Sequence, residues 1–238
     1  AKEHNLYVIE DNAQGIGADY TSNDGTKNKT GGIGHVGSTS FFPSKNLGCY
    51  GDGGAIFTND DALAHSIRGI VNHGMYERYH HDVVGVNSRL DSIQAAVLRA
   101  KLPNLDAYNA TRREAAQKYN KAFAEIENIS TPSGSCSPGN IICASCDCHV
   151  FHQYTLRVLQ IDRDALAKHL NEQGIPCGVY YPIPLHLQKA YRDTRYKEED
   201  FPVTNQLVQE VISLPMHTEL DDEQIDFITQ TVIDFVTK

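Results

Sequence analysis

The stretch "STSFFPSKNLGCYGDGG", residues 38–54, carries the strongest signal in this chain. Residues 38–42 predict a strand, Lys45 follows the strand end, and a Gly-Asp-Gly-Gly turn leads into a second strand at 54–58. A lysine that only faces water needs no such setting among aromatic residues and glycines. At the mouth of a buried strand, a lysine can lose its proton by desolvation and attack a carbonyl as the free amine. Lys45 is therefore our candidate reactive residue.

The surrounding sequence alternates between strand and helix patterns. Residues 6–10 predict a buried strand that ends at Asp11, and residues 60–70 predict a helix with an Asn or Asp cap and acidic residues in its first turn. Alternation at this spacing predicts an α/β domain with a mostly parallel sheet. Open α/β sheets bind ligands at the carboxyl ends of their strands, where Asp11, Ser40 and Lys45 are expected.

These three residue types suit one cofactor. A carboxylate such as Asp11 can hold a heterocyclic nitrogen in its protonated form, and Ser40 with nearby backbone N–H groups can bind a phosphate. A lysine Schiff base, a carboxylate for a pyridinium and phosphate donors together indicate pyridoxal 5'-phosphate. Singly, each residue has an ordinary structural explanation: a loop-capping Asp, a solvated Lys and a Ser in a turn.

The second half of the chain predicts a smaller α+β domain. A long helical region follows residue 88, and Pro103 should break it. Residues 130–148 form a Ser/Gly/Cys/Pro-rich loop. After it we expect a strand at 150–159, a helix at 163–174 ending on a glycine, a short strand at 177–181, and a last helix starting at Asp221 with a capping box. The predicted domains are residues 1–105 and residues 106–238.

Composition narrows the class of protein. The chain has 238 residues, of which 40% are hydrophobic and 21% charged, as in globular proteins. Its net charge of −9 comes without a visible basic patch, which argues against nucleic-acid binding. No apolar run approaches the roughly 20 residues that span a bilayer. Six cysteines in a chain of this length do not form a disulfide scaffold, which favours a reducing cytoplasm.

Longer motifs resemble one enzyme family. "VIEDNAQGIGADY", "GHVGSTSFFPSKNLGCYGDGGAIFTND", "GVNSRLDSIQAAVLRAKL", "HVFHQYTLRV", "YYPIPLHLQKAY" and "SLPMHTEL" together are similar to the DegT/DnrJ/EryC1/StrS sugar aminotransferases, which are fold-type I pyridoxal-phosphate enzymes. The resemblance implies an incomplete large-domain sheet plus a small C-terminal domain, because the first part of the family pattern is absent. The chain also begins without methionine, so we expect a piece of a longer protein or a truncated product.

The resemblance also assigns residues. It implies that Lys45 forms the Schiff base, that Asp11 pairs with the pyridine nitrogen, and that Gln14 lies against the cofactor ring. Ser40 would bind the cofactor phosphate, and Asn87 would reach the phosphate of a neighbouring subunit in a homodimer with a shared active site. The weaker assignments to the substrate site are Arg89, Tyr181 and His186.

The implied reaction moves an amino group from glutamate to a nucleotide-linked keto sugar, for amino-sugar or surface-polysaccharide biosynthesis. "YYPIPLHLQ" resembles members that act on 3-keto sugars more than those that act on 4-keto sugars. Lys45 argues against relatives that have histidine there and remove a hydroxyl. A different class remains open: a dimerising remnant without turnover, whose strands would expose edges and apolar faces.

The cysteine-rich loop allows two interpretations. Cys143, Cys146, Cys148 and His149 have a spacing that can close on zinc, but the second half of a paired CxxC site is missing. We therefore favour a plain loop and predict no metal site.

Overall fold

The computed structural model describes residues 1–132 and 148–238. Within them the chain divides into two units: the first comprises residues 1–110 and 148–152, and the second comprises residues 111–132 and 153–238. Helix α3 (Leu105–Phe123) begins in the first unit and continues into the second. The expected domain limits, 1–105 and 106–238, stay a prediction, since two units of this kind do not test where an independently folding domain ends.

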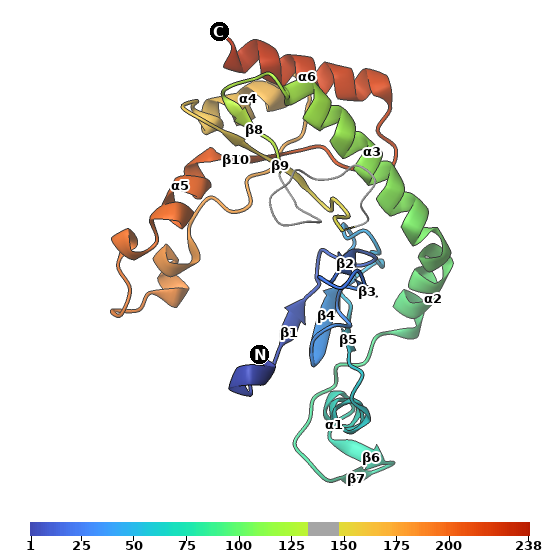
Figure 1. Cartoon of the computed structure of the whole chain (residues 1–238). Helices are drawn as coiled ribbons and strands as arrows, with labels where there is room; N and C mark the ends of the chain where they lie inside the picture. The colour runs from blue at the N-terminus through green and yellow to red at the C-terminus, as the bar shows by residue number, and fades with distance from the viewer. Residues whose placement is uncertain (133–147) are drawn as a thin grey trace. The chain divides into compact units, whose positions relative to one another are not determined.

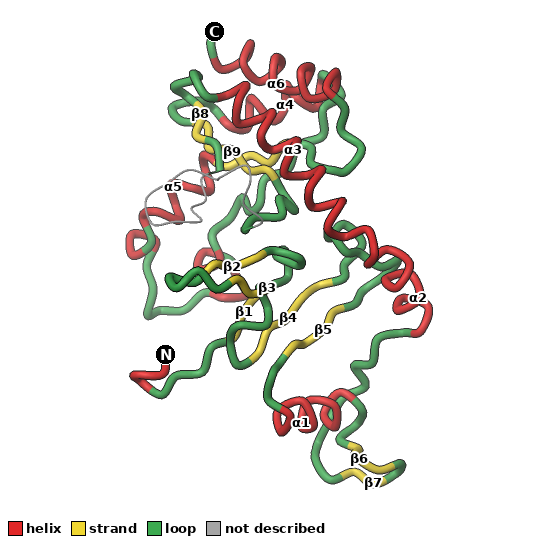
Figure 2. Tube along the Cα trace, turned by 45° about the vertical axis from the view of Figure 1, so that its right-hand side comes forward, coloured by secondary structure: helices red, strands yellow, loops and turns green. Residues whose placement is uncertain are grey.

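Three short strands form the sheet of the first unit, in the order β1 (Ile9–Asp11), β4 (Val36–Ser40) and β5 (Gly54–Phe57), as Figures 1 and 2 show. β1 runs parallel to β4, whereas β5 runs antiparallel to it. The described sheet is therefore mixed and not mostly parallel. The reason is the connection between β4 and β5, which contains no crossover helix and turns straight back along the sheet.

The strand predicted at residues 6–10 is present in part as β1, but its predicted start and its predicted burial are wrong. Regular pairing begins at Ile9, and the side chains of Tyr7 and Ile9 are 86% and 75% exposed. In the described part of the chain, β1 pairs with β4 on one side alone. Because no described element covers the apolar side chains of this segment, a hydrophobic run that reads as buried lies on the surface instead.

The remaining elements of the first unit follow the expected pattern of caps and turns. Helix α1 (Asp61–Val71) starts at the predicted cap, because Asp60 accepts a hydrogen bond from Leu63 N. Pro103 lies in a 3₁₀ turn that separates α2 from α3, as predicted. The other elements are η1 (Lys2–His4), β2 (Asp19–Thr21), β3 (Lys27–Lys29), β6 (Met75–Glu77), β7 (His80–His81), α2 (Ser92–Lys101) and η2 (Leu102–Asn104).

The second unit is built on the antiparallel sheet β10-β9-β8 and the helices around it (Figure 1). Its strands are β8 (Ile129–Ser130), β9 (Tyr154–Val158) and β10 (Val211–Leu214); its helices after α3 are α4 (Arg163–Glu172), α5 (Pro202–Glu210) and α6 (Asp222–Val236), with 3₁₀ turns η3 (Leu185–Leu187), η4 (Lys189–Tyr191) and η5 (Glu198–Asp200). The predicted capping box of α6 is present between Asp221 and Gln224. Burial of Tyr119 and Tyr154 between these elements raises the pKa of both phenols.

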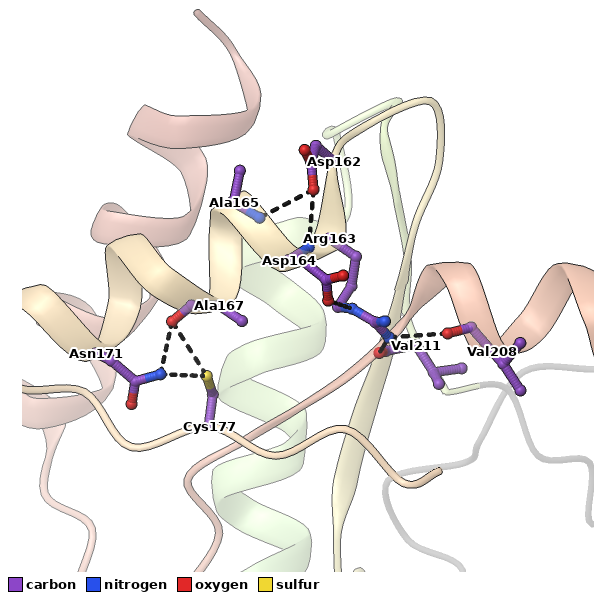
Figure 3. Close-up of polar contacts among 9 residues, drawn as sticks. All are labelled: Asp162, Arg163, Asp164, Ala165, Ala167, Asn171, Cys177, Val208 and Val211. Carbon is purple, nitrogen blue, oxygen red and sulfur yellow. Dashed lines mark hydrogen bonds and ion pairs between the residues drawn. The ribbon is translucent and has the colours of Figure 1, made fainter. Parts of the chain in front are cut away.

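A buried arginine joins α4 to the end of α5 (Figure 3). Asp162 caps α4 by accepting hydrogen bonds from the N–H groups of Asp164 and Ala165. The next residue, Arg163, is 5% exposed and donates to the carbonyls of Val208 and Val211. Sequence patterns did not predict α5 and β10, which this arginine connects to the rest of the unit.

The prediction of a short strand at residues 177–181 is also wrong. The backbone of Gly178 exchanges two hydrogen bonds with Ser213 of β10, and the pairing ends with this single bridge. The prolines at 182 and 184 lack the N–H groups that a continued ladder needs. The segment therefore leaves the sheet edge as a loop.

Candidate functional site

The ends of β1 and β4 bring the predicted residues of the first unit to one edge of the sheet. The parallel register pairs Asp11 with Ser38, and the antiparallel register pairs Ser40 with Gly54. The carboxyl ends of β1 and β4 and the start of β5 therefore share an edge, which Figure 2 lets the reader follow. The loop that carries Lys45 leaves from and returns to this edge.

The Lys45 loop, residues 41–53, is held by its own backbone. Lys45 N donates to Phe42 O, Cys49 N donates to Phe41 O, and Phe41 N donates to Gly53 O. Gly48 lies so close to the backbone that an added Cβ would stand 2.3 Å from Pro43 O. The Lys45 side chain is half-buried, and its Nζ makes no hydrogen bond or ion pair with any of the described residues. The amine is thus available to react.

A pair of buried amides lies directly behind Lys45. Asn46 Nδ2 donates to Asn109 Oδ1 at 2.7 Å and to Val150 O at 2.9 Å, and Asn109 Nδ2 donates to Ile16 O at 3.1 Å. Both amides are less than one tenth exposed. Bonds among buried polar groups of this kind fix the backbone that they connect, here the Lys45 loop and the loop after β1.

Asp11 and Ser40, the other two strand-end residues, can still make hydrogen bonds to a ligand. Asp11 is exposed, and its Oδ1 accepts one hydrogen bond, from Ala13 N at 3.1 Å. Ser40 Oγ accepts a hydrogen bond from Phe42 N at 3.2 Å, so its hydroxyl proton can still be donated. Gln14 is exposed and lies in the loop that follows β1.

Asn87 and Arg89 lie in the segment between β7 and α2 of the first unit. Both line a cavity of about 990 Å³ between β5, α1 and the segment before α2. Arg89 Nη1 donates to Asn72 Oδ1 at 2.8 Å. Asp11, Gln14, Ser40 and Lys45 are not among the lining residues of this cavity. Gly54, which pairs with Ser40, does line it, so the cavity reaches the start of β5 at the strand-end edge.

Tyr181 and His186 belong to the second unit. Tyr181 is 71% exposed, whereas His186 is half-buried and its ring lies 4.5 Å from that of Phe201. His186 Nε2 is buried without a hydrogen-bond partner among the described residues. An unpaired ring nitrogen of this kind can bind a polar group of a ligand.

The described residues contain no cluster of three or more His, Cys, Asp or Glu side chains that could hold a metal ion. Cys143 and Cys146, on which the zinc alternative depends, lie outside the described residues. Among the helices of the described segments, none is both long and apolar enough to cross a bilayer.

Residues 1–233 match the DegT/DnrJ/EryC1/StrS aminotransferase family. The chain belongs to this family. It is 43% identical over 99% of its length to a pleiotropic regulatory protein of Geobacillus stearothermophilus, and it spans 59% of that protein. It is 42% identical over 98% of its length to a UDP-N-acetyl-3-dehydro-α-D-glucosamine 3-aminotransferase of Acidithiobacillus ferrooxidans, of which it spans 58%. The chain thus covers about three fifths of these relatives.

Solved structures agree with this membership. A crystal structure of S. venezuelae DesV in complex with a ketimine intermediate matches all of this chain and 60% of the other, with a TM-score of 0.88 and 35% identity. The fold is accordingly that of the pyridoxal-phosphate-dependent members of the DegT/DnrJ/EryC1/StrS family, with mixed α/β content. Relatives of the chain include transaminases of UDP-linked and dTDP-linked 3-amino sugars.

Pyridoxal phosphate is the cofactor of the DegT/DnrJ/EryC1/StrS family, and neighbouring structures contain a ketimine intermediate or the cofactor PMP. The residues of this chain fit such a group. Lys45 offers a half-buried amine without a partner among the described residues, Asp11 offers an exposed carboxylate, and Ser40 offers a free hydroxyl proton. All three lie at or next to one sheet edge.

Sequence reasoning missed two residues that adjoin Asp11. Glu10 and Asn12 both make side-chain hydrogen bonds to the loop at residues 30–34. A signal was present in this member of the family: an acidic residue inside an apolar strand, followed downstream by the glycine-rich "TGGIG". Successive backbone N–H groups of such a loop can surround a carboxylate.

Proposed function

We propose that this chain is the greater part of a pyridoxal-phosphate-dependent aminotransferase that moves an amino group from glutamate to a nucleotide-linked 3-keto sugar. The observation that carries the proposal is the arrangement of Asp11, Ser40 and the Lys45 loop at one sheet edge. The names of relatives that aminate UDP-linked sugars at carbon 3 support the substrate class.

Lys45 and Asp11 divide the chemistry. When bound, pyridoxal phosphate supplies an aldehyde for amines and a ring that withdraws electrons. Lys45 would hold the group through its amine, and the same amine would act as the base and acid that moves a proton at the substrate carbon. Asp11 keeps the ring nitrogen protonated by ion pairing.

The remaining assigned residues bind and orient. Ser40 donates to the cofactor phosphate, and Gln14 lies against the ring. Asn87 serves the active site of a second subunit in a homodimer, as the resemblance to the family implies. Arg89, Tyr181 and His186 contact the sugar nucleotide or glutamate.

The test is chemical labelling of Lys45. We expect the full chain, reduced with borohydride in the presence of pyridoxal phosphate, to carry the label on Lys45 in peptide maps. Lys45→Ala should carry no label. Lys29→Ala is the control. Because Lys29 Nζ is already bound to Asp19 and to Gly17 O, this variant should still carry the label on Lys45. A label on Lys29 or Lys101 in the wild type would contradict the proposal.

The sugar specificity needs a separate measurement. Mass spectrometry of products from matched 3-keto and 4-keto sugar nucleotides, with glutamate as donor, should find amination of the 3-keto substrate. Faster amination of the 4-keto sugar would reverse this part of the proposal while leaving the cofactor chemistry intact.

The alternative is a dimerising protein without turnover. The exposed apolar side chains of Tyr7 and Ile9 favour it, because they offer surface for association. Colour separates the two functions: bound pyridoxal phosphate absorbs near the violet edge of the visible spectrum. A colourless chain at saturating cofactor supports the alternative.

A further inference from the structure

Glu10, the residue before Asp11, accepts three hydrogen bonds from a single loop. Its Oε2 accepts from Gly31 N at 2.7 Å, and its Oε1 accepts from Ile33 N at 2.6 Å and from Gly34 N at 2.5 Å. Hydrogen bonds to an ionised carboxylate are shorter and stronger than neutral ones. The carboxylate therefore ties β1 to residues 30–34.

Asn12, the residue after Asp11, is tied to the same loop. It is 5% exposed, its Nδ2 donates to Thr30 O at 3.1 Å, and its Oδ1 accepts from Thr30 Oγ1 at 2.8 Å. Thr39 Oγ1 of β4 donates to Asn12 O at 3.0 Å. Asp11 therefore lies between two neighbours that both hold residues 30–34.

The loop itself has little room to move. Gly31 is buried with a φ of +89°, a conformation that favours glycine. It packs so closely on β4 that a Cβ added at Gly37 would stand 2.0 Å from Gly31 O. A loop that contacts β4 this closely is a firm anchor for β1.

Asp11 needs such an anchor because its strand is weakly supported. β1 has three residues, and in the described part of the chain it pairs with β4 alone. Successive side chains of a strand point to opposite faces, so Glu10 can hold the loop while the Asp11 carboxylate stays exposed. A strand this short that is paired on one side in the described chain is held weakly by its backbone hydrogen bonds alone.

We propose that Glu10 and Asn12 are positioning residues that fix the Asp11 carboxylate against the cofactor ring by holding residues 30–34. This inference rests on the proposed function, since it needs Asp11 to pair with the ring nitrogen. In the sequence Glu10-Asp11-Asn12, the outer two residues hold the loop and the middle one binds the cofactor.

The first experiment measures, in the absence of cofactor, how firmly Glu10 holds residues 30–34. Hydrogen exchange of the full chain should be at least about tenfold faster at Gly31, Ile33 and Gly34 in Glu10→Gln, because bonds to a charged acceptor are lost. Glu210→Gln is the matched control. The Glu210 carboxylate also accepts three hydrogen bonds, two from Arg157 and one from Gln206, in the second unit. Unchanged exchange in Glu10→Gln would overturn the inference.

The second experiment reads the position of Asp11. Glu10→Gln should weaken pyridoxal phosphate binding about tenfold and alter the circular dichroism of the bound cofactor, in the same direction as is expected for Asp11→Asn. Glu210→Gln should leave both unchanged even if it lowers stability equally. A looser loop with an unchanged cofactor spectrum would mean that Glu10 is only structural, and would overturn the proposal.

A second pair of variants tests the role of Asn12. It keeps the proposal testable even if Glu10→Gln does not fold. Thr30→Val removes the hydroxyl that bonds to Asn12 Oδ1 and also lies within reach of the carbonyls of Gly15 and Ala18, whereas Thr30→Ser keeps the hydroxyl. We expect the cofactor spectrum to change in Thr30→Val and to be restored in Thr30→Ser. Equal spectra in both variants would overturn the role of Asn12.

Failure of the proposed function gives a different result. If the wild-type chain binds no pyridoxal phosphate, or if Asp11→Asn leaves the circular dichroism of the bound cofactor unchanged, the role of Asp11 is wrong and the positioning role falls with it. If Asp11→Asn changes the spectrum and the Glu10 and Thr30 variants do not, only the positioning role is wrong.

Discussion

Individual residues at the sheet edge differ in how the fold treats them. Lys45 is half-buried in a loop held by backbone hydrogen bonds, whereas Asp11 is exposed and makes a single side-chain bond. Glu10 is engaged by three N–H groups of one loop and points to the opposite face of the strand from Asp11. Of the two adjacent acids, Asp11 is therefore the one that can meet a ring nitrogen.

The first prediction concerns the charge of Asp11. Asp11→Asn keeps the shape and a hydrogen-bond acceptor but removes the charge, so the colour of the bound cofactor should survive. The ring nitrogen should lose its proton, and the glutamate half-reaction should slow by orders of magnitude, since about 1.4 kcal/mol is already tenfold in rate. Single-turnover absorbance on adding glutamate measures this. Equal rates in the two proteins would mean that Asp11 only caps its loop.

The second prediction follows from the pKa of Glu10. Partial burial raises the pKa of Glu10, but the hydrogen bonds from the N–H groups of Gly34, Gly31 and Ile33 together lower it by more. The pKa of Glu10 is therefore below its ordinary value of 4.5. A lowered pKa in the folded state contributes stability above pH 4.5 that is lost as the pH falls through the folded value. The stability difference between wild type and Glu10→Gln should therefore shrink in acid.

Urea unfolding of both proteins from about pH 7 down to pH 3 measures that difference. A difference that stays constant over the whole range would contradict the lowered pKa, because the wild-type carboxylate would then not titrate within it.

At the scale of elements, the second unit depends on how α4, α5 and β10 are joined. The predicted start of α4 is present, with Asp162 as its cap, and Gly174 follows its end with a φ of +77°. Arg163 then connects this helix start to the carbonyls of Val208 and Val211 (Figure 3). One side chain thus satisfies acceptors at the junction of α5 and β10.

The third prediction tests this junction. Arg163→Met should lower the free energy of unfolding by about 2–4 kcal/mol, because it leaves two carbonyls of a buried junction without their donor. Lys168→Met is the control on the same helix, because Lys168 is exposed and its distance to Glu172 is 3.8 Å. The control should change stability by less than about 0.5 kcal/mol. Similar urea midpoints for both variants would show that Arg163 is not needed.

At the scale of the whole molecule, the first unit exposes apolar side chains that a globular protein usually covers. They come from the segment before β1, from β1 and from β5: Leu6, Tyr7, Ile9 and Ile56. Exposed apolar side chains on a unit of this size are a reason to expect association with another surface.

The fourth prediction is therefore assembly. We expect the full chain to form a homodimer in which Asn87 lies near Ser40 and Lys45 of the other subunit. Static light scattering at micromolar concentration with pyridoxal phosphate measures the mass. A monomer under these conditions would contradict both the shared site and the covered apolar surface.

Local patterns alone determined several parts of this protein. Helix starts at Asp60 and Asp221, the break at Pro103 and the turn after α4 follow from capping and backbone chemistry that acts within a few residues. Lys45 was singled out in the same way, by its strand-end setting. These features need no distant partner, so sequence reasoning reaches them.

Tertiary structure decided what depends on distant partners. Residues 6–10 look buried in sequence, but no described element covers them, and residues 177–181 meet β10 at a single bridge. Two sets of hydrogen bonds join segments far apart in the chain: those from residues 30–34 to Glu10, and the one between the buried amides of Asn46 and Asn109. Hydrogen bonds and burial of this kind arise only when the folded backbone brings their partners within reach, which no local pattern encodes.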